Sequence, residues 1–156
     1  LVGFGGHAYA AGIKIKKEKI PEFRTRINEY AARVMKEEDL LASVDVDIVL
    51  SSSRLSMRFA EEISQLGPFG QENHAPIFVS DDFVMGRPCR IVGEDHLKLF
   101  LKNREGIPLT GIGFGMGSWQ DKISSGVGLG LAYELEINDF NGQKNIQINI
   151  RDIHLR

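Results

Sequence analysis

The sequence contains one cysteine, Cys89, and no apolar run that approaches the ~20 residues of a membrane-spanning helix. A single cysteine cannot pair within the chain, which excludes a disulfide scaffold and favours a reducing compartment. The opening residues, LVGFGGHAYAAG, lack the charged lead and the long apolar core of a secretory signal peptide. Because the first residue is Leu rather than Met, we expect the sequence to be a fragment of a longer protein.

No single sign of charge dominates, since 19 Lys and Arg oppose 21 Asp and Glu, for a formal net charge of −2. Domains that bind nucleic acid are commonly basic, so this total argues weakly against that class. The distribution is uneven, with net charges of +5 over residues 1–36, −8 over 37–82 and +3 over 83–104. Salt screens charges over about 8–10 Å, so a local basic patch can act despite a neutral total. On charge alone, ordinary solvated surfaces remain the simpler interpretation.

Apolar periodicity predicts a short strand at 13–16, an amphipathic helix over 20–37 and a half-buried strand over 44–50. Ser51–Ser53 predict the cap of a second helix, which Gly67-Pro68 ends. From Ile77 onward the pattern is β, with strands expected at 77–84, 88–93, 96–102, 108–116, 127–138 and 143–153.

These elements predict an α+β chain in three parts: an α/β piece (1–50), a linker helix with a connector (51–75), and an all-β barrel (76–156). Asn141-Gly142, between the last two strands, is a strong hairpin signal. Alternate glycines at 111–117 and 126–130 permit the sharp bending that closes a small barrel. Five or six short strands in about 80 residues favour that architecture.

A glycine cluster near the start is the first candidate binding site. Consecutive glycine N–H groups can point inward and form a nest for a phosphate, to which a histidine can also donate. No Gly-Lys-Ser/Thr follows, so this is not a P-loop, and a tight turn with a packed histidine is the alternative. The candidate phosphate ligands are Gly5, Gly6, His7 and Gly12.

The expected strand at 96–102 is the second candidate. Three leucines alternate with a cationic and aromatic face, which is the combination that sequence-tolerant single-strand binding uses. An ordinary solvent face with one exposed Phe is about equally consistent with the pattern. The candidate residues are His96, Lys98, Phe100 and Lys102, with Arg90 on the preceding strand.

Catalytic and metal-binding patterns are sparse. The four histidines are widely separated, and no CxxC or HExxH motif is present. The pairs Asp45/Asp47 and Asp81/Asp82 offer carboxylates for a metal, but alternate acids on a strand are usually solvated. The sequence therefore does not predict a complete active site.

Residues 5–12, GGHAYAAG, match the GGHxxAAG motif of DHHA1 domains, which accompany DHH-type phosphoesterases. Residues 66–78, LGPFGQENHAPIF, resemble the connector of the RecJ family, although Glu72 and His74 replace a usual glycine and proline. His96-Leu97-Lys98-Leu99 and Ile112-Gly113-Phe114 resemble the OB-fold of the same family. The resemblance extends over essentially the whole chain.

This resemblance implies a bacterial, cytoplasmic 5′→3′ exonuclease specific for single-stranded DNA. In the family, a DHH domain holds Mn²⁺ or Mg²⁺ and performs the hydrolysis, and nothing in this chain matches its motifs. We therefore expect no metal site, no catalytic residue and no activity here, but the C-terminal part of a DHHA1 domain (1–50) and an OB-fold domain (76–156).

By the same resemblance, the glycine cluster contacts a substrate phosphate and the barrel grips nucleotides. The expected partners are single-stranded DNA and the preceding DHH domain of the same chain, with no membrane. Two alternatives remain open: a barrel that docks a protein such as a single-strand-binding protein, and an RNA-directed DHH/DHHA1 phosphoesterase.

Overall fold

The computed structural model describes residues 2–7, 10–140 and 142–156. The chain divides into two compact units between Ser43 and Val44. This division precedes the sequence-based boundary at residue 50, because residues 48–49 pair with the sheet of the second unit. Within the described residues, no helix is long and apolar enough to cross a membrane.

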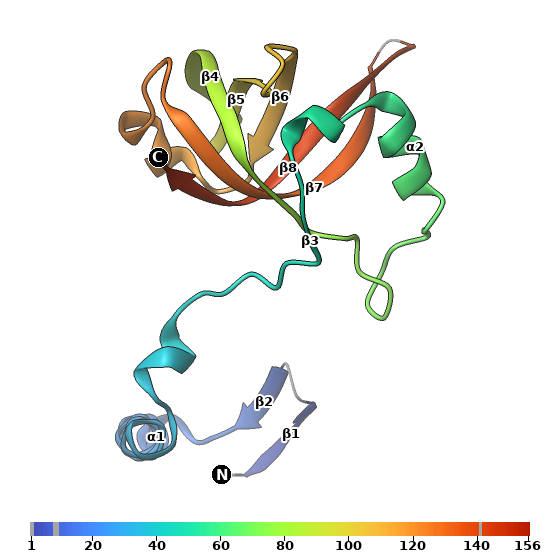
Figure 1. Ribbon diagram of the computed structural model, residues 1–156. Coiled ribbons are helices and arrows are strands. Elements are labelled where there is room, and N and C mark those ends of the chain that lie inside the picture. Colours follow the sequence, from blue (N-terminus) through green and yellow to red (C-terminus); the bar gives the residue numbers. More distant parts are fainter. Residues whose placement is uncertain (1, 8–9, 141) are drawn as a thin grey trace. The chain divides into compact units, whose positions relative to one another are not determined.

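The first unit consists of a hairpin followed by a helix (Figure 1). Strands β1 (Gly3–His7) and β2 (Ala10–Lys14) pair antiparallel, with Gly5 opposite Gly12. After a short 3₁₀ turn, η1 (Lys17–Lys19), comes helix α1 (Ile20–Val34), in which Pro21 occupies the first turn, a position that proline favours. The predicted helix is confirmed but ends three residues early, because Met35 is extended before η2 (Glu37–Leu40).

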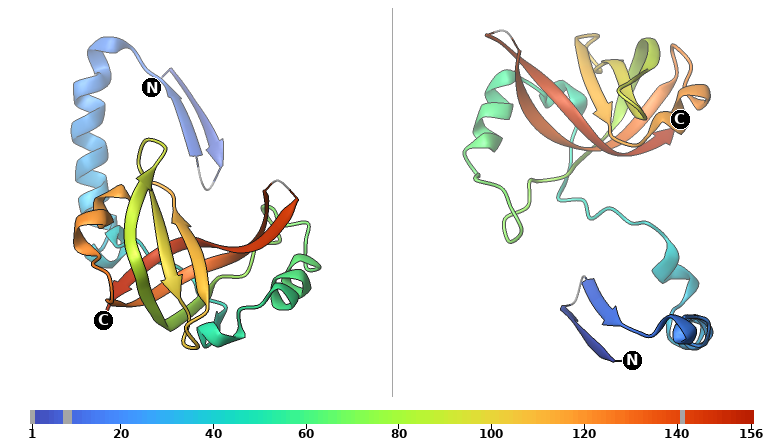
Figure 2. Two further views of the ribbon diagram at one scale, coloured as in Figure 1. Left: turned by 90° about the horizontal axis from the view of Figure 1, so that it is seen from above. Right: turned by 180° about the vertical axis from the view of Figure 1, so that it is seen from behind.

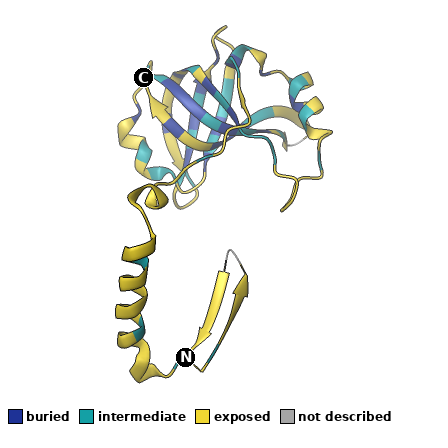
Figure 3. Ribbon diagram, turned by 60° about the horizontal axis from the view of Figure 1, so that its bottom comes forward, coloured by how far each residue is buried: buried dark blue, intermediate teal, exposed yellow. Residues whose placement is uncertain are grey.

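Exposure is high throughout the described part of this unit, where no residue is buried (Figure 3). Phe4 is 84% exposed and Tyr30 is 59% exposed. A two-stranded hairpin with one helix offers too little apolar surface for a core of its own. Its own burial therefore contributes little to the stability of this unit.

The second unit is a closed five-stranded barrel, which confirms the predicted β architecture (Figure 2). Its sheet runs in the order β4-β5-β6-β8-β7, and β7 returns to pair with β4. A two-residue strand, β3 (Ile48–Val49), pairs parallel to the start of β4. The barrel strands are β4 (Phe78–Val92), β5 (His96–Lys102), β6 (Pro108–Gly113), β7 (Gly128–Phe140) and β8 (Gln143–Leu155).

Strand β4 differs from the sequence-based expectation of two strands at 77–84 and 88–93. It is one long strand that pairs with β7 along its first half and with β5 along its second, and Val84 pairs with both. The register with β5 shifts twice, around Gly86 and between Arg87 and Arg90. Gly86 and Pro88 interrupt the apolar alternation, which explains why the pattern predicts a break where the strand only bends.

Short helices pack against the barrel. Helix α2 (Met57–Ser64) begins at Ser56, whose hydroxyl accepts a hydrogen bond from the Phe59 N–H at 3.1 Å. The helix packs on the barrel through Ala60 and through Phe59, whose ring lies 5.6 Å from that of Phe78. The linker helix thus belongs to the barrel unit. The remaining 3₁₀ turns are η3 (Ser52–Arg54) and η4 (Gly117–Lys122).

The barrel core contains one buried polar pair. The hydroxyls of Ser80 and Tyr133 lie 2.8 Å apart, surrounded by residues such as Phe83 that are almost fully buried. Burial raises the pKa of Tyr133 to about 12, so its hydroxyl stays protonated at physiological pH. The pair satisfies the polar groups of both side chains inside an otherwise apolar core.

Two of the four carboxylates that the sequence offered as metal ligands, Asp47 and Asp82, have structural roles. Asp47 accepts the backbone N–H of Ile77 at 2.8 Å, which fixes β3 beside β4. Asp82 accepts the Ser51 hydroxyl at 2.6 Å and the Ser52 N–H at 2.9 Å. Partial burial raises the pKa of Asp82, but these hydrogen bonds outweigh it and hold the pKa below its usual range.

We expect Asp82→Asn to lower the free energy of unfolding by about 1–3 kcal/mol at pH 7, because it removes the charge from two hydrogen bonds. The lowered pKa in the folded state means that the stabilisation is complete above the unfolded pKa of about 3.9 and is lost as the pH falls through the folded value. Urea unfolding of the native chain and of Asp82→Asn, at pH 7 and at successively lower pH, measures this difference in the free energy of unfolding. Asp81→Asn, an exposed neighbour, is the control, and equal stabilities of the two variants at pH 7 contradict the prediction.

We expect Gly111→Ala to destabilise the barrel by about 1–3 kcal/mol, because a Cβ there stands 2.9 Å from Cδ1 of Ile150 in the core. At Gly128 a Cβ meets its nearest neighbour, the Cβ of Arg156, at an ordinary 3.5 Å. Gly128→Ala is therefore the matched strand control. Thermal unfolding of both variants tests this prediction. A loss of stability in Gly111→Ala that is no larger than the loss in Gly128→Ala contradicts it.

Candidate nucleic-acid interface

The outward face of β5 carries the cationic and aromatic residues that the sequence predicts. The three leucines of this strand are 0–2% exposed and point into the core, which confirms the alternation. The outward residues are half-buried, except for the exposed last one; they are His96, Lys98, Phe100 and Lys102.

Strand register extends this face into two rows across four strands. Cross-strand neighbours have Cβ atoms about 4.5–5.5 Å apart, so side chains within a row can act together. The first row joins β4, β5, β6 and β8 through Arg87, Phe100, Thr110 and Gln147. The second row joins the same strands through Arg90, Lys98, Ile112 and Asn149.

An open groove of about 920 Å³ runs over the first row. Cations line its β4–β5 side, amides and a hydroxyl line its β6–β8 side, and apolar residues line one part of it. The cations are Arg87, Lys98 and Lys102, and the polar neutral groups include Thr110, Asn138, Asn145 and Gln147. The apolar part includes Leu55, Met57, Ile107 and Pro108. Such a surface offers separate places for phosphates and for bases.

Arg87 makes the closest contact with the aromatic ring in this groove. Its guanidinium carbon lies 3.7 Å from the ring centroid of Phe100, and that of Arg90 lies 5.5 Å from the same centroid. Both distances are within the range of cation–π attraction. Two exposed cations therefore gather over one half-buried ring.

Sequence reasoning missed Arg87 because this residue lies in the break expected between strands at 77–84 and 88–93, whereas β4 runs through it with a register shift. Strict alternation from the buried Met85 places residue 87 on the inner face, but the extra residue at Gly86 turns Arg87 outward. The buried Cys89 then restores the inward phase. The glycine and proline on either side of Arg87 are the sequence signal that indicates such a bulge.

His96 and Arg90 lie beside the groove rather than among the described residues that line it. His96 accepts the Gly115 N–H at Nδ1, at 3.3 Å, and its ring meets that of Phe114 edge-on at 5.0 Å. These contacts hold the start of β5 against the loop that follows β6. Arg90 stays near the groove through Phe100.

The glycine cluster lies in the first unit and adopts a conformation different from the expected nest. Gly5, Gly6 and His7 belong to β1 and Gly12 belongs to β2. In a strand, successive N–H groups point to opposite sides, so Gly5 and Gly6 do not converge on one ion and the predicted nest is wrong. A Cβ at Gly6 would stand 2.5 Å from the carbonyl oxygen of Ala10, so close approach of the two strands requires a glycine there. Ala8 and Tyr9 of the motif lie outside the described residues.

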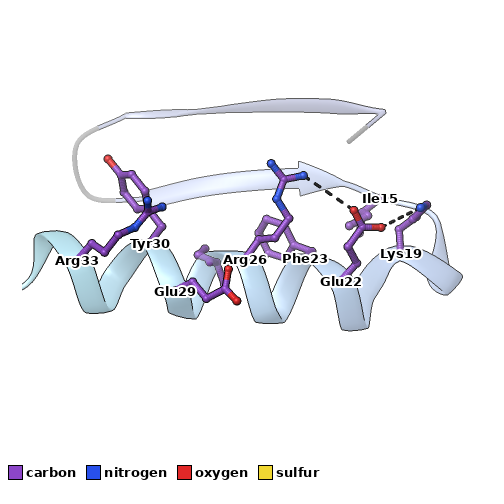
Figure 4. A pocket seen from close by; sticks show the side chains of 9 residues that line it. Ile15, Lys19, Glu22, Phe23, Arg26, Glu29, Tyr30 and Arg33 are labelled. Carbon is purple, nitrogen blue, oxygen red and sulfur yellow. Dashed lines mark hydrogen bonds and ion pairs between the residues drawn. The ribbon is translucent and has the colours of Figure 1, made fainter.

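A second hollow lies along α1 within the first unit (Figure 4). Its residues come from α1 and the segment before it, and charged groups predominate around Phe23 and Tyr30. Glu22 forms an ion pair with Lys19 at 2.8 Å and lies 3.9 Å from Arg26, so its carboxylate partly neutralises the positive charge along this hollow. Its charge pattern indicates no particular ligand.

We searched the described part of the chain for side chains that could bind a metal ion together. No group of three or more His, Cys, Asp or Glu side chains there is arranged to hold an ion. Burial raises the pKa of the Cys89 thiol, which disfavours the thiolate that a metal or an electrophile requires. The residues present therefore do not fit a divalent metal centre.

The strand order defines the class of protein. A five-stranded barrel in which the first strand pairs with both the second and the fourth, and the third with the fifth, is an OB-fold. The face of its second and third strands, here β5 and β6, is where OB-folds bind oligonucleotides and oligosaccharides. The groove over Phe100 and Thr110 lies on that face.

The family follows from comparison with known proteins. The family profile described as RecJ OB domain matches residues 46–152, and the chain belongs to this family. Relatives named single-stranded-DNA-specific exonuclease RecJ are 33% identical in Bacillus subtilis over 97% of this chain and 36% identical in Salmonella typhimurium over 98%. The chain spans 19% and 26% of those two proteins.

Solved structures show the same fold. RecJ of Thermus thermophilus in complex with Mn²⁺ superposes with a TM-score of 0.71 at 24% identity, over 99% of this chain and 22% of that one. The Mg²⁺ complex of the same protein gives a TM-score of 0.67 at 25% identity, over 98% of this chain and 23% of that one.

Proposed function

We propose that this chain is the substrate-binding, C-terminal part of a RecJ-like single-stranded-DNA exonuclease, and that its barrel binds single-stranded DNA in the groove over Phe100. The groove itself is the observation that carries this proposal. It lies on the binding face of an OB-fold and joins cations to an aromatic ring and to side-chain amides. The curated relatives are exonucleases named for single-stranded DNA, which agrees with that chemistry.

The two sides of the groove suit the two parts of a nucleotide. Lys98 and Lys102 on β5, with Arg87 on β4, offer positive charge to phosphates. Across Phe100, Asn145 and Gln147 on β8 offer amides that can donate to and accept from base edges. A strand bound here directs its backbone toward the β4–β5 side and its bases toward β6 and β8.

We propose that hydrolysis belongs to a part of the parent protein outside this chain. The described residues do not fit a metal centre, whereas the Thermus RecJ structures are complexes with Mn²⁺ and Mg²⁺. On the sequence resemblance to the RecJ family, we propose that the parent is a metal-dependent 5′→3′ exonuclease of the bacterial cytoplasm that acts in DNA repair and recombination. The role of this chain is to hold the DNA strand, and we expect the purified chain to show no hydrolysis of single-stranded DNA.

The first unit is proposed to be the C-terminal part of a DHHA1 domain, on the strength of the motif at residues 5–12. Gly5, Gly6, Gly12 and His7 remain the proposed phosphate contacts. In paired strands these residues would contact phosphate separately, as individual backbone groups and a histidine side chain, rather than together as a closed nest. His7→Ala tests this contact with a 5′-phosphorylated strand.

A second candidate function is docking of a protein partner, such as a single-strand-binding protein. The apolar part of the groove, where Ile107 is 49% exposed beside Pro108 and Met57, favours it. Salt separates the candidates, because phosphate binding weakens steeply with salt and apolar docking does not. An RNA-directed role is a third candidate that the same oligonucleotide experiment resolves.

We expect the chain to bind a fluorescent 5′-phosphorylated DNA strand more tightly than a duplex, with log Kd rising linearly with log salt. Lys98→Gln should weaken binding about two- to tenfold and reduce the salt slope by about one charge, since it removes one phosphate contact. Fluorescence anisotropy over a salt series measures both quantities.

Lys122→Gln, a cation of η4 outside the groove, is the matched control and should leave the slope unchanged. Equal affinities for the strand and the duplex contradict the proposal, as does an unchanged slope in Lys98→Gln. Tighter binding of an RNA strand than of DNA favours the RNA-directed alternative. Absence of binding at low salt favours the protein-docking alternative.

A further inference from the structure

The aromatic ring of the groove is not free to receive a base. The guanidinium of Arg87 lies 3.7 Å from the ring centroid of Phe100, which is van der Waals contact for two planar groups. It therefore occupies one face of the ring, and no base fits on that face while the contact lasts. The ring is half-buried, whereas Arg87 is exposed. A base that approaches this face meets Arg87 first.

The ring and the guanidinium stabilise each other. A cation over a ring face gains about 0.5–1 kcal/mol when exposed, and more when it loses water. The two residues are direct partners in the β4–β5 register, and the bulge at Gly86 turns Arg87 onto this face. A base could reach the ring only if Arg87 moved away. Arg90 lies 5.5 Å from the same ring centroid, so a cation would remain near the ring even then.

We propose that Arg87, held over the ring of Phe100, is the platform on which a nucleobase stacks. This inference rests on the proposed function, and it assigns base stacking to the guanidinium of Arg87 rather than to the ring of Phe100. A guanidinium is planar, delocalised and weakly hydrated, so a base stacks on its outer face while its N–H groups donate in their own plane. Single-stranded nucleic acids use such guanidinium planes as well as aromatic rings.

In this arrangement Arg87 can contact a phosphate and stack on a base at the same time. In-plane donors of Arg87 reach a phosphate on the cationic side of the groove, while the stacked base extends across the row toward Thr110 and Gln147. A lysine in the same place supplies the charge but offers no plane. The ligand that fits is therefore an unpaired nucleotide of any base, because every base has a π face.

Two strands of equal length and charge test the platform, an oligothymidylate and its abasic sugar–phosphate analogue, each titrated with the chain by fluorescence anisotropy. The native chain should prefer the strand that carries bases. Arg87→Lys should weaken binding of the oligothymidylate about fivefold or more, and change binding of the abasic strand less than about twofold. Its salt slope should stay that of the native chain, because the charge is kept.

Two further variants separate the plane from the charge. Arg87→Gln keeps a planar group without the charge, so it should lower the salt slope by about one and retain part of the base preference. Phe100→Leu removes the support of the guanidinium, so it should lose base preference to the same extent as Arg87→Lys. The double variant should then be no worse than either single one, because residues that act as one unit are not additive.

Arg87 is exposed, so its variants should keep the far-UV circular dichroism and the unfolding midpoint of the native chain, and Lys122→Gln serves as the binding control. A native affinity for oligothymidylate in Arg87→Lys overturns the platform and leaves a simple phosphate contact. Additive losses in the double variant overturn it as well. If the native chain binds strands with and without bases equally, the groove is electrostatic and the platform is absent. If it binds neither strand, the proposed function fails and the platform fails with it.

Discussion

The bend of β4 is the constraint on which the barrel and its groove both depend. One strand must pair with β7 along its first half and with β5 along its second, so it has to curve around the core. Two register shifts provide that curvature, since each bulge sharpens the local bend and twist. The same shifts decide which side chains face outward. Arg87 reaches the outer face only because the residue at Gly86 is extra, and barrel closure thereby places a cation over Phe100.

Regular periodicity explains how much the sequence could predict. In β5, apolar and polar residues alternate without interruption, so its inward leucines and its outward face at Lys98 and Phe100 follow from the sequence. The final hairpin follows as well, because Asn141-Gly142 separates two alternating runs. Prediction failed where the period changes, at Gly86 in β4. It also failed in the hairpin at Gly5 and Gly12, where glycines that permit a nest lie in paired strands, since glycine permits many conformations and specifies none.

The site depends on contacts that no local pattern records. Gln147 comes next to Thr110 through a parallel pairing of β6 with β8, which joins strands that are not consecutive in the chain. Asp82 is anchored to Ser51 and Ser52 across a similar gap in sequence, so one of the carboxylates that the sequence offered to a metal has a structural role. In both cases the sequence supplies the right chemical groups, and the barrel topology decides which of them meet.

The near-neutral total charge is compatible with a groove that binds a polyanion. The cations of the groove come from residues 87–102, a short stretch of β4 and β5, whereas acids concentrate before residue 83. Local charge governs contact because screening confines each field to about 8–10 Å. Weak overall attraction also means that charge alone holds a strand loosely, so stacking has to supply a larger share of the grip. A planar cation supported by an aromatic ring offers charge and stacking from one side chain, which suits a protein with few positive charges to spare.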